Sequence, residues 1–309
     1  MAREISIGGA VAEGFGLIRS KPLAVLTWGL IQVVFMALLF SLMAPLVLTS
    51  FGELIQQAKA GGMPSPQAME RVQQFQAINY LLQFAGILVS SVFYCAVFRA
   101  VLHPEQSRFA YMRLGAAELQ IALLTVAALF AFGISLALVV VVVGIVVAIF
   151  VVLHAGVVAA IIGVAGGIAA AVALVYFWLR LSLVAPMIVD GGGFDLTASW
   201  RLTKGRVGGL FAIAVVLLLI LIVGEIVVGL VMVGIGLGVI GSAAGGLRNL
   251  PAFFQHPPSD IVAKLAPVLV AFAVIWVPLY GCVLAIVGAP WARVYRDLKP
   301  PSDIASTFA

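Results

Sequence analysis

Long apolar stretches separated by short polar connections dominate this chain. A helix needs about 20 apolar residues to cross the hydrocarbon core of a bilayer. The stretches therefore predict six membrane-spanning helices, at residues 22–49, 77–102, 119–153, 157–189, 207–241 and 261–291. Residues 119–179 contain no Asp, Glu, Lys or Arg, and this run could hold two long helices or three ordinary ones. The pattern predicts an all-α integral membrane bundle whose span count needs a second argument.

The distribution of basic residues supplies that argument. With six spans, all but four of the 17 Lys and Arg residues lie on the side that carries both termini; the exceptions are Lys59, Arg71, Arg248 and Lys264. Because cytoplasmic connections are enriched in Lys and Arg, we predict six transmembrane helices with both termini cytoplasmic. The long third, fourth and fifth spans are expected to tilt or kink. An eight-span arrangement, which also divides the fifth span at Glu225, remains open but breaks the charge rule.

Composition identifies lipid as the solvent. The chain is 64% hydrophobic and 9% charged, whereas an ordinary soluble domain has about 25% charged residues. Its net charge of +5 comes from bases that flank apolar spans. We therefore expect these bases to contact anionic lipid headgroups of the membrane and not nucleic acid. Cys95 and Cys282 lie inside apolar stretches, which indicates neither a disulfide nor a metal site.

The chain also shows an internal pattern. Three short basic, amphipathic stretches, at residues 5–21, 107–118 and 194–206, each precede two spans. They predict interfacial helices on the cytoplasmic side and a single transmembrane domain over residues 1–309, with a possible three-fold repeat at 1–102, 103–189 and 190–309. The alternative is that any six-span protein places such segments at its inner interface.

Glu225 and Arg180 are the candidate intramembrane polar residues. Glu225 lies in an otherwise apolar stretch, where an acid is costly and is expected to face the bundle interior or a wet cavity. Counting about 1.5 Å of rise per residue from the span ends brings Arg180 to a similar depth. We predict that the two side chains pair. The pair could be a structural contact between spans or part of a site for protons or solute.

The densest polar segment is 190–206, where three glycines predict a flexible turn before a run of hydroxyls and bases. Such groups could bind the phosphate of a lipid headgroup at a helix start. The candidate ligands for a headgroup or another anion are Ser199, Trp200, Arg201, Lys204 and Arg206. The alternative is a plain inner-leaflet anchor with Trp200 in the headgroup layer.

Catalytic signatures are missing from the sequence. It has no HExxH, no phosphate-binding GxxxxGK[ST], no Cys/His metal cluster and no GxSxG. We therefore expect a protein that is not an enzyme, with no catalytic residue, no metal and no cofactor.

Two motifs carry a resemblance to a known family. The segments 195–206, with sequence DLTASWRLTKGR, and 292–298, with ARVYRDL, resemble bacterial multi-pass membrane proteins. These are similar to the membrane domain that precedes the catalytic barrel in some glycerophosphodiester phosphodiesterases, and the stretch from Arg180 to Pro186 fits the same pattern. The resemblance implies a six-helix protein of the bacterial inner membrane. It implies no phosphodiesterase activity, since spans and short loops take up the 309 residues.

Together these observations predict a non-enzymatic inner-membrane protein that binds lipid or partner proteins in envelope maintenance. The alternative is a transporter of a small or amphiphilic solute that uses Glu225 and Arg180 in the bundle interior. An enzyme acting on lipid headgroups is the third possibility, and would need Asp190, Asp195 and Arg201 to converge.

Overall fold

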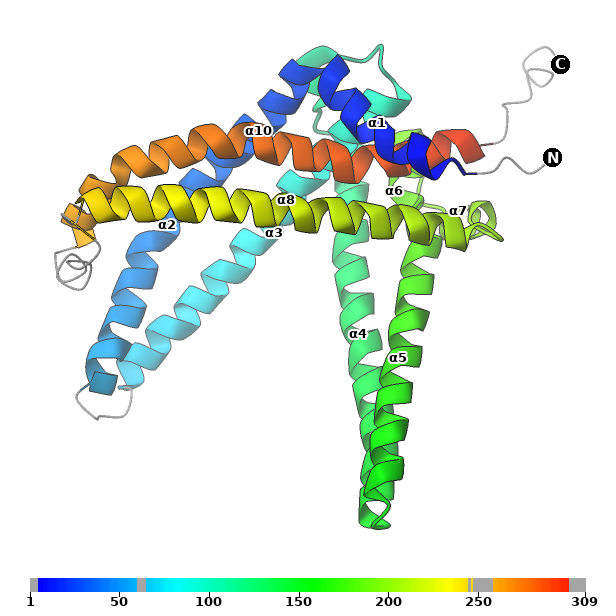
Figure 1. Ribbon diagram of the computed structural model, residues 1–309, viewed down its shortest axis with the longest axis horizontal. Coiled ribbons are helices and arrows are strands. Elements are labelled where there is room, and N and C mark those ends of the chain that lie inside the picture. The colour runs from blue at the N-terminus through cyan, green and yellow to red at the C-terminus, as the bar shows by residue number, and fades with distance from the viewer. Residues whose placement is uncertain (1–4, 60–64, 244–245, 247–257, 300–309) are drawn as a thin grey trace. The chain divides into compact units, whose positions relative to one another are not determined.

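The computed structural model describes residues 5–59, 65–243, 246 and 258–299. Within these residues the chain is all-α, and six segments are long and apolar enough to cross a membrane. This confirms the predicted six-span, all-α fold. The elements are α1 (Ile7–Ser20), α2 (Pro22–Lys59), α3 (Pro66–Leu102), η1 (Arg108–Tyr111), α4 (Ala116–Val152), α5 (Gly156–Leu181), α6 (Val184–Val189), α7 (Leu196–Leu202), α8 (Val207–Ala243) and α10 (Pro258–Leu298) (Figure 1).

The chain divides into two compact units that are discontinuous in sequence. Unit 1 comprises Met1–Ala10, Ala85–Ile213 and Gly288–Ala309, and unit 2 comprises Val11–Phe84 and Ala214–Val287. The helices α3, α8 and α10 each contribute one end to unit 1 and the rest to unit 2. The boundaries of these units differ from those of the predicted repeats, and the repeat itself stays a prediction.

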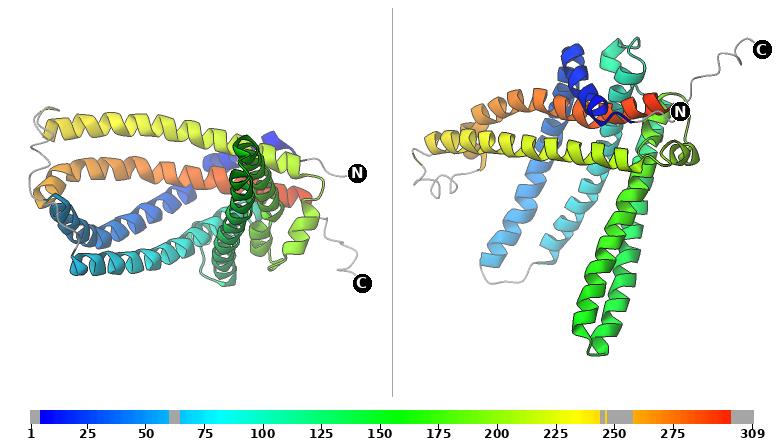
Figure 2. Two further views of the ribbon diagram at one scale, coloured as in Figure 1. Left: turned by 90° about the horizontal axis from the view of Figure 1, so that it is seen from below. Right: turned by 45° about the vertical axis from the view of Figure 1, so that its right-hand side comes forward.

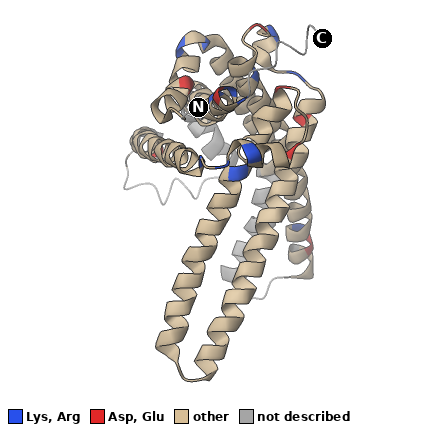
Figure 3. Ribbon diagram, turned by 90° about the vertical axis from the view of Figure 1, so that its right-hand side faces the viewer, with Lys and Arg blue, Asp and Glu red and all other residues tan. Residues whose placement is uncertain are grey.

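In unit 1, the charge-free run forms two helices and not three. α4 and α5 lie side by side as a hairpin in every view (Figures 1 and 2). The hairpin turns at His154, which has φ of 60° and is exposed. Figure 3 shows the two helices without charge along their length, with charged residues at the end where α4 begins and α5 ends. The α4–α5 hairpin therefore has one apolar tip and one polar end.

The predicted fourth span, 157–189, is interrupted near the polar end. α5 ends at Leu181, and the short α6 begins at Val184. Pro186 explains the break, because its ring clashes with the carbonyl four residues earlier, that of Ser182, and it has no N–H to bond there. The interruption lets α6 pack against both α4 and α7.

The predicted interfacial stretches have two different outcomes. Helices α1 and α7 occupy the first and third stretches. The prediction of a helix over residues 107–118 is wrong, because Phe109, Ala110 and Tyr111 have positive φ and α4 begins only at Ala116. The second stretch is a tight left-handed turn.

Unit 2 holds a close crossing of α2 and α10. A Cβ on Gly29 would lie 1.8 Å from the carbonyl oxygen of Val277, and one on Gly281 would lie 2.1 Å from that of Val25. The two glycines thus form a reciprocal antiparallel contact, which permits backbone approach that any side chain would prevent.

The polar end of unit 1 rests on an apolar core. Its fully buried side chains come from the ends of α3 and α10, from α6 and from the start of α8: Phe93, Val97, Leu183, Val184, Leu210, Ile213 and Val294. This packing fixes the helix ends that carry the polar residues described next.

Candidate functional site

Asp190 is positioned by the end of α6. Gly191 has φ of 87° and donates its N–H to the Ile188 carbonyl at 3.2 Å, while Gly192 donates to the Met187 carbonyl at 3.0 Å. This pair of bonds is a Schellman motif, which closes a helix by satisfying its last carbonyls. The glycines at 191 and 192 therefore form a defined cap, whereas the sequence predicted a flexible turn.

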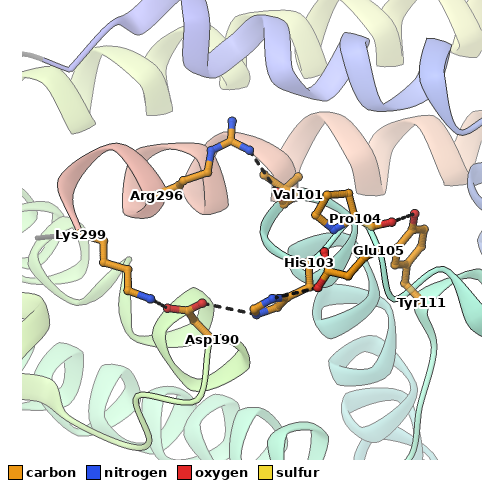
Figure 4. A network of polar contacts seen from close by, with 8 residues as sticks. All are labelled: Val101, His103, Pro104, Glu105, Tyr111, Asp190, Arg296 and Lys299. Carbon is orange, nitrogen blue, oxygen red and sulfur yellow. Dashed lines mark hydrogen bonds and ion pairs between the residues drawn. The ribbon is translucent and has the colours of Figure 1, made fainter. Parts of the chain in front are cut away.

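The Asp190 carboxylate joins the ends of three helices (Figure 4). Its Oδ2 accepts a hydrogen bond at 2.8 Å from the hydroxyl of Tyr295, at the end of α10, and pairs with Lys299, directly after that helix. Its Oδ1 lies 3.4 Å from Nε2 of His103, just beyond α3, and Nδ1 of that ring lies 3.6 Å from Glu105. One half-buried carboxylate thus links the terminus of α6 to those of α3 and α10.

A second contact reinforces the same junction. Arg296 of α10 donates from Nη1 to the carbonyl of Val101, in the last turn of α3, at 3.1 Å (Figure 4). A cation at a helix C-terminus satisfies a carbonyl that has no partner within the helix and opposes the negative end of the helix dipole. We call Asp190, His103, Tyr295, Arg296 and Lys299 the helix-end junction.

Arg180, at the end of α5, is buried and holds α7. Its Nε lies 3.1 Å from the Tyr176 hydroxyl, and its Nη1 donates to the Trp200 carbonyl at 2.9 Å. The guanidinium also lies over two aromatic rings, 5.3 Å from the Tyr176 centroid and 4.6 Å from the Trp200 centroid. Within the described part of the chain, no carboxylate forms an ion pair with Arg180. Neutral dipoles and π-faces stabilise this cation.

The five predicted anion ligands separate into two groups. Ser199 is buried and donates its hydroxyl to the Arg180 carbonyl at 2.8 Å, so it is a structural contact and cannot reach a headgroup. Arg206 is half-buried and donates to the Leu202 carbonyl at 3.0 Å, which caps the end of α7. Trp200 is 37% exposed, and Arg201 and Lys204 are exposed. These three remain available to an external partner.

The start of α7 is capped by a carboxylate. Asp195 is its N-cap: the carboxylate accepts hydrogen bonds from the Ala198 N–H at 2.9 Å and the Thr197 hydroxyl at 2.7 Å. The Ala198 bond, followed by that of Thr197, lowers the pKa of Asp195 below its ordinary value. A carboxylate already occupies the positive end of the helix and disfavours a phosphate there, so binding of a phosphate at this helix start stays a prediction. An anion can also approach the exposed bases farther along the segment.

A buried ion pair lies beside the left-handed turn. Nη1 of Arg99, near the end of α3, is 2.5 Å from Oε1 of Glu118, in the first turn of α4. The same nitrogen donates to the Tyr111 carbonyl at 3.3 Å. Glu118 is 5% exposed, and the ion pair with Arg99 is the principal compensation for its buried charge.

Glu225 lies in unit 2, on α8, and its side chain is exposed. We expected it to face a bundle interior, and within its own unit it does not. Glu225 was also predicted to pair with Arg180. The Arg180 guanidinium instead forms hydrogen bonds with Tyr176, Trp200 and Thr203.

Sequence reasoning missed His103, Glu118, Tyr295, Arg296 and Lys299 as site residues. Tyr295 and Arg296 belong to the segment 292–298 that carries the family resemblance, and the other three are polar residues that flank a span. The available signal was that a polar residue follows each of the second, fourth and sixth spans, which the six-span topology places on one side.

Among the described residues, no group of His, Cys, Asp and Glu is arranged to hold a metal ion. Comparisons with protein-family models, with curated proteins and with solved structures gave no match. The fold and the six apolar segments define the class: an all-α, multi-pass membrane protein.

Proposed function

We propose that this protein is a non-enzymatic membrane module that binds anionic lipid headgroups through the α7 segment. The observation that carries the proposal is a pair of exposed bases, Arg201 and Lys204, beside the partly exposed ring of Trp200. Bases next to an interfacial aromatic residue favour an anionic membrane surface.

The position of α7 supports the same proposal. Hydrogen bonds run in both directions between α5 and α7, from Arg180 to the Trp200 carbonyl and from Ser199 to the Arg180 carbonyl. The segment is therefore held at the polar end of an apolar hairpin. Phe194 and Leu196 are also exposed there and can enter the headgroup layer.

In this proposal the segment faces the cytoplasmic leaflet of a bacterial inner membrane, as the distribution of basic residues and the family resemblance favour. Binding of anionic lipid would hold the module in the envelope and leave other surfaces for protein partners. No contact of Arg180 or Glu225 within the described residues favours the transporter alternative, which stays a sequence prediction.

The experiment is native mass spectrometry of protein extracted gently from bilayers of phosphatidylglycerol and phosphatidylethanolamine. The double variant Arg201→Gln/Lys204→Gln is compared with Arg71→Glu, which lowers the net charge by the same amount at an exposed position in unit 2 that the predicted topology places on the opposite side of the membrane. Each base near an anionic surface contributes about 1 kcal/mol. The first variant should therefore lose affinity for retained phosphatidylglycerol by roughly thirtyfold.

The control variant should retain the lipid of the wild type. Equal retention in the two variants would contradict the proposal, because it would show that net charge and not the α7 segment holds the lipid.

A further inference from the structure

The turn over residues 107–115 has an unusual backbone. Phe109, Ala110 and Tyr111 have φ of 52°, 53° and 66°, so three consecutive L-residues are left-handed. Single residues visit this region occasionally, but runs of them are strongly disfavoured. Such strain persists only where the surroundings impose it, and it clusters at functional segments.

Tyr111 and Arg99 impose it here. The Tyr111 side chain is buried and its hydroxyl donates to the Pro104 carbonyl at 3.1 Å (Figure 4). Its own carbonyl accepts from Arg99, which the ion pair with Glu118 fixes in turn. One end of the strained run is thus tied to the ends of α3 and α4.

The other residues of the turn point outward. Phe109 is 73% exposed and Leu114 is 89% exposed. Arg108 and Arg113 are exposed beside them, and the Arg108 guanidinium lies 5.3 Å from the centroid of the Phe109 ring. The turn contains no acidic residue. It therefore presents two large apolar side chains and two positive charges together.

We propose that this turn is a membrane-inserting wedge, with Phe109 and Leu114 in the interfacial layer of an anionic leaflet and Arg108 and Arg113 at the lipid phosphates. Charge complementarity selects the occupant, since both flanking charges are positive. Long basic side chains can cover apolar surface while their charged ends reach the headgroups. The turn also directly precedes α4, an apolar span, which places it at the edge of a hydrocarbon layer.

The wedge stands on residues other than those of the α7 segment, so each proposal can fail alone. The α7 proposal concerns retention of a lipid, and the wedge concerns the depth of a turn. A variant of Arg201 and Lys204 should leave the depth of Phe109 unchanged.

The test measures depth with nitroxide labels in nanodiscs of phosphatidylglycerol and phosphatidylcholine. Cysteine replaces Phe109, Leu114 or Ser107 one at a time, in a Cys282→Ala background where the remaining native thiol, Cys95, is buried. Ser107 is exposed and polar and serves as the matched control from the same turn. Collisions with oxygen report lipid, and collisions with a water-soluble nickel complex report water.

Labels at 109 and 114 should collide more with oxygen than with nickel, and the label at 107 should show the reverse preference. Arg108→Gln/Arg113→Gln should move the label at 114 toward water.

The proposal is overturned if labels at 109 and 114 collide with nickel as often as the label at 107 does. It is equally overturned if both probes are excluded from 109 and 114, which would indicate a covering protein. Phe109→Trp, with fluorescence quenching by shallow brominated lipids, gives a second measurement should the cysteine variants fold poorly.

Discussion

Two buried arginines in unit 1 occupy similar places and are compensated in different ways. Arg99 lies near the end of α3 and Arg180 near the end of α5, and each is 7% exposed. Each donates from Nη1 to a backbone carbonyl of the following connection, that of Tyr111 for Arg99 and that of Trp200 for Arg180. The shared arrangement ties a helix end to the chain that follows it.

The difference lies in the neighbouring charge. Arg99 faces the carboxylate of Glu118, whereas Arg180 is surrounded by a carbonyl, hydroxyls and two aromatic rings. The first pair is neutral as a unit, and the second leaves a net positive charge under α7. A guanidinium tolerates this because it is delocalised and weakly hydrated, and aromatic faces attract it. The comparison shows that a buried arginine near a helix end can have its charge cancelled by a carboxylate, as Arg99 does. It can also keep its charge, as Arg180 does, beside a surface that we propose binds anions.

The largest effect is expected at the neutral pair. Arg99→Met should lower the free energy of unfolding by about 3–5 kcal/mol, because it leaves the Glu118 carboxylate buried and uncompensated. The measurement is reversible unfolding by dodecyl sulfate in mixed micelles. The double variant Arg99→Met/Glu118→Leu should recover most of the loss, since no charge then remains. A double variant as unstable as the single one would show that the carbonyl of Tyr111, and not the charge, determines the role of Arg99.

A smaller effect is expected at Arg180. Arg180→Gln removes hydrogen bonds and ring contacts but strands no opposite charge, so a loss of about 2 kcal/mol is expected. Amide hydrogen exchange should accelerate in α7 and stay unchanged in the middle of α4.

The matched control for Arg180 is Arg206→Gln, because Arg206 contacts a carbonyl of α7 itself. It should perturb α7 less than Arg180→Gln does. If Arg180→Gln is as destabilising as Arg99→Met, then a neighbouring carboxylate does not make Arg99 more important for stability than Arg180.

A third arginine extends the comparison to the end of α10. Arg293 pairs with Asp297 one turn later on the same helix at 3.0 Å, and both side chains are 36% exposed. Exposed pairs of this spacing contribute about 0.3–0.5 kcal/mol. Asp297→Asn should therefore change the unfolding free energy within that range, and less so at high salt. A loss above 1 kcal/mol would mean that this helix end depends on its ion pair as Arg99 does.

The sequence was sufficient for the spans and insufficient for their side-chain partners. Apolar length left two or three helices open over residues 119–179, and the distribution of basic residues predicted two, because cytoplasmic connections are enriched in Lys and Arg. The sequence predicts Arg180 as a candidate residue and, from depth in the membrane alone, Glu225 as its partner. Depth along a helix says nothing about which way a side chain points, and the break before α6 was not expected.

The close contacts between helices also could not be predicted from the sequence. The close crossing in unit 2 uses Gly29 and Gly281, neither of which has a second glycine four residues away. By contrast Gly234 and Gly238, which match the spacing typical of close helix contacts, have no atom within 4 Å of an added Cβ. The pairing of Arg99 with Glu118 likewise needs the turn at Tyr111, whose left-handed backbone no composition signals.

The smallest expected effect concerns pH and the cap of α7, the element that Arg180 holds. Hydrogen bonds from Ala198 and Thr197 favour the ionised carboxylate of Asp195 and lower its pKa in the folded state. The cap therefore stabilises α7 fully at pH above the unfolded pKa of about 3.9. This contribution is lost as the pH falls through the lower, folded pKa.

Hydrogen exchange of α7 amides, corrected for intrinsic rates, should show constant protection from neutral pH to about pH 4 and a loss below it. Asp195→Asn caps without titrating, so its protection should not follow that pH dependence. An identical loss of protection in the wild type and Asp195→Asn would assign the transition to another group and leave the hold of Arg180 as the main constraint on α7.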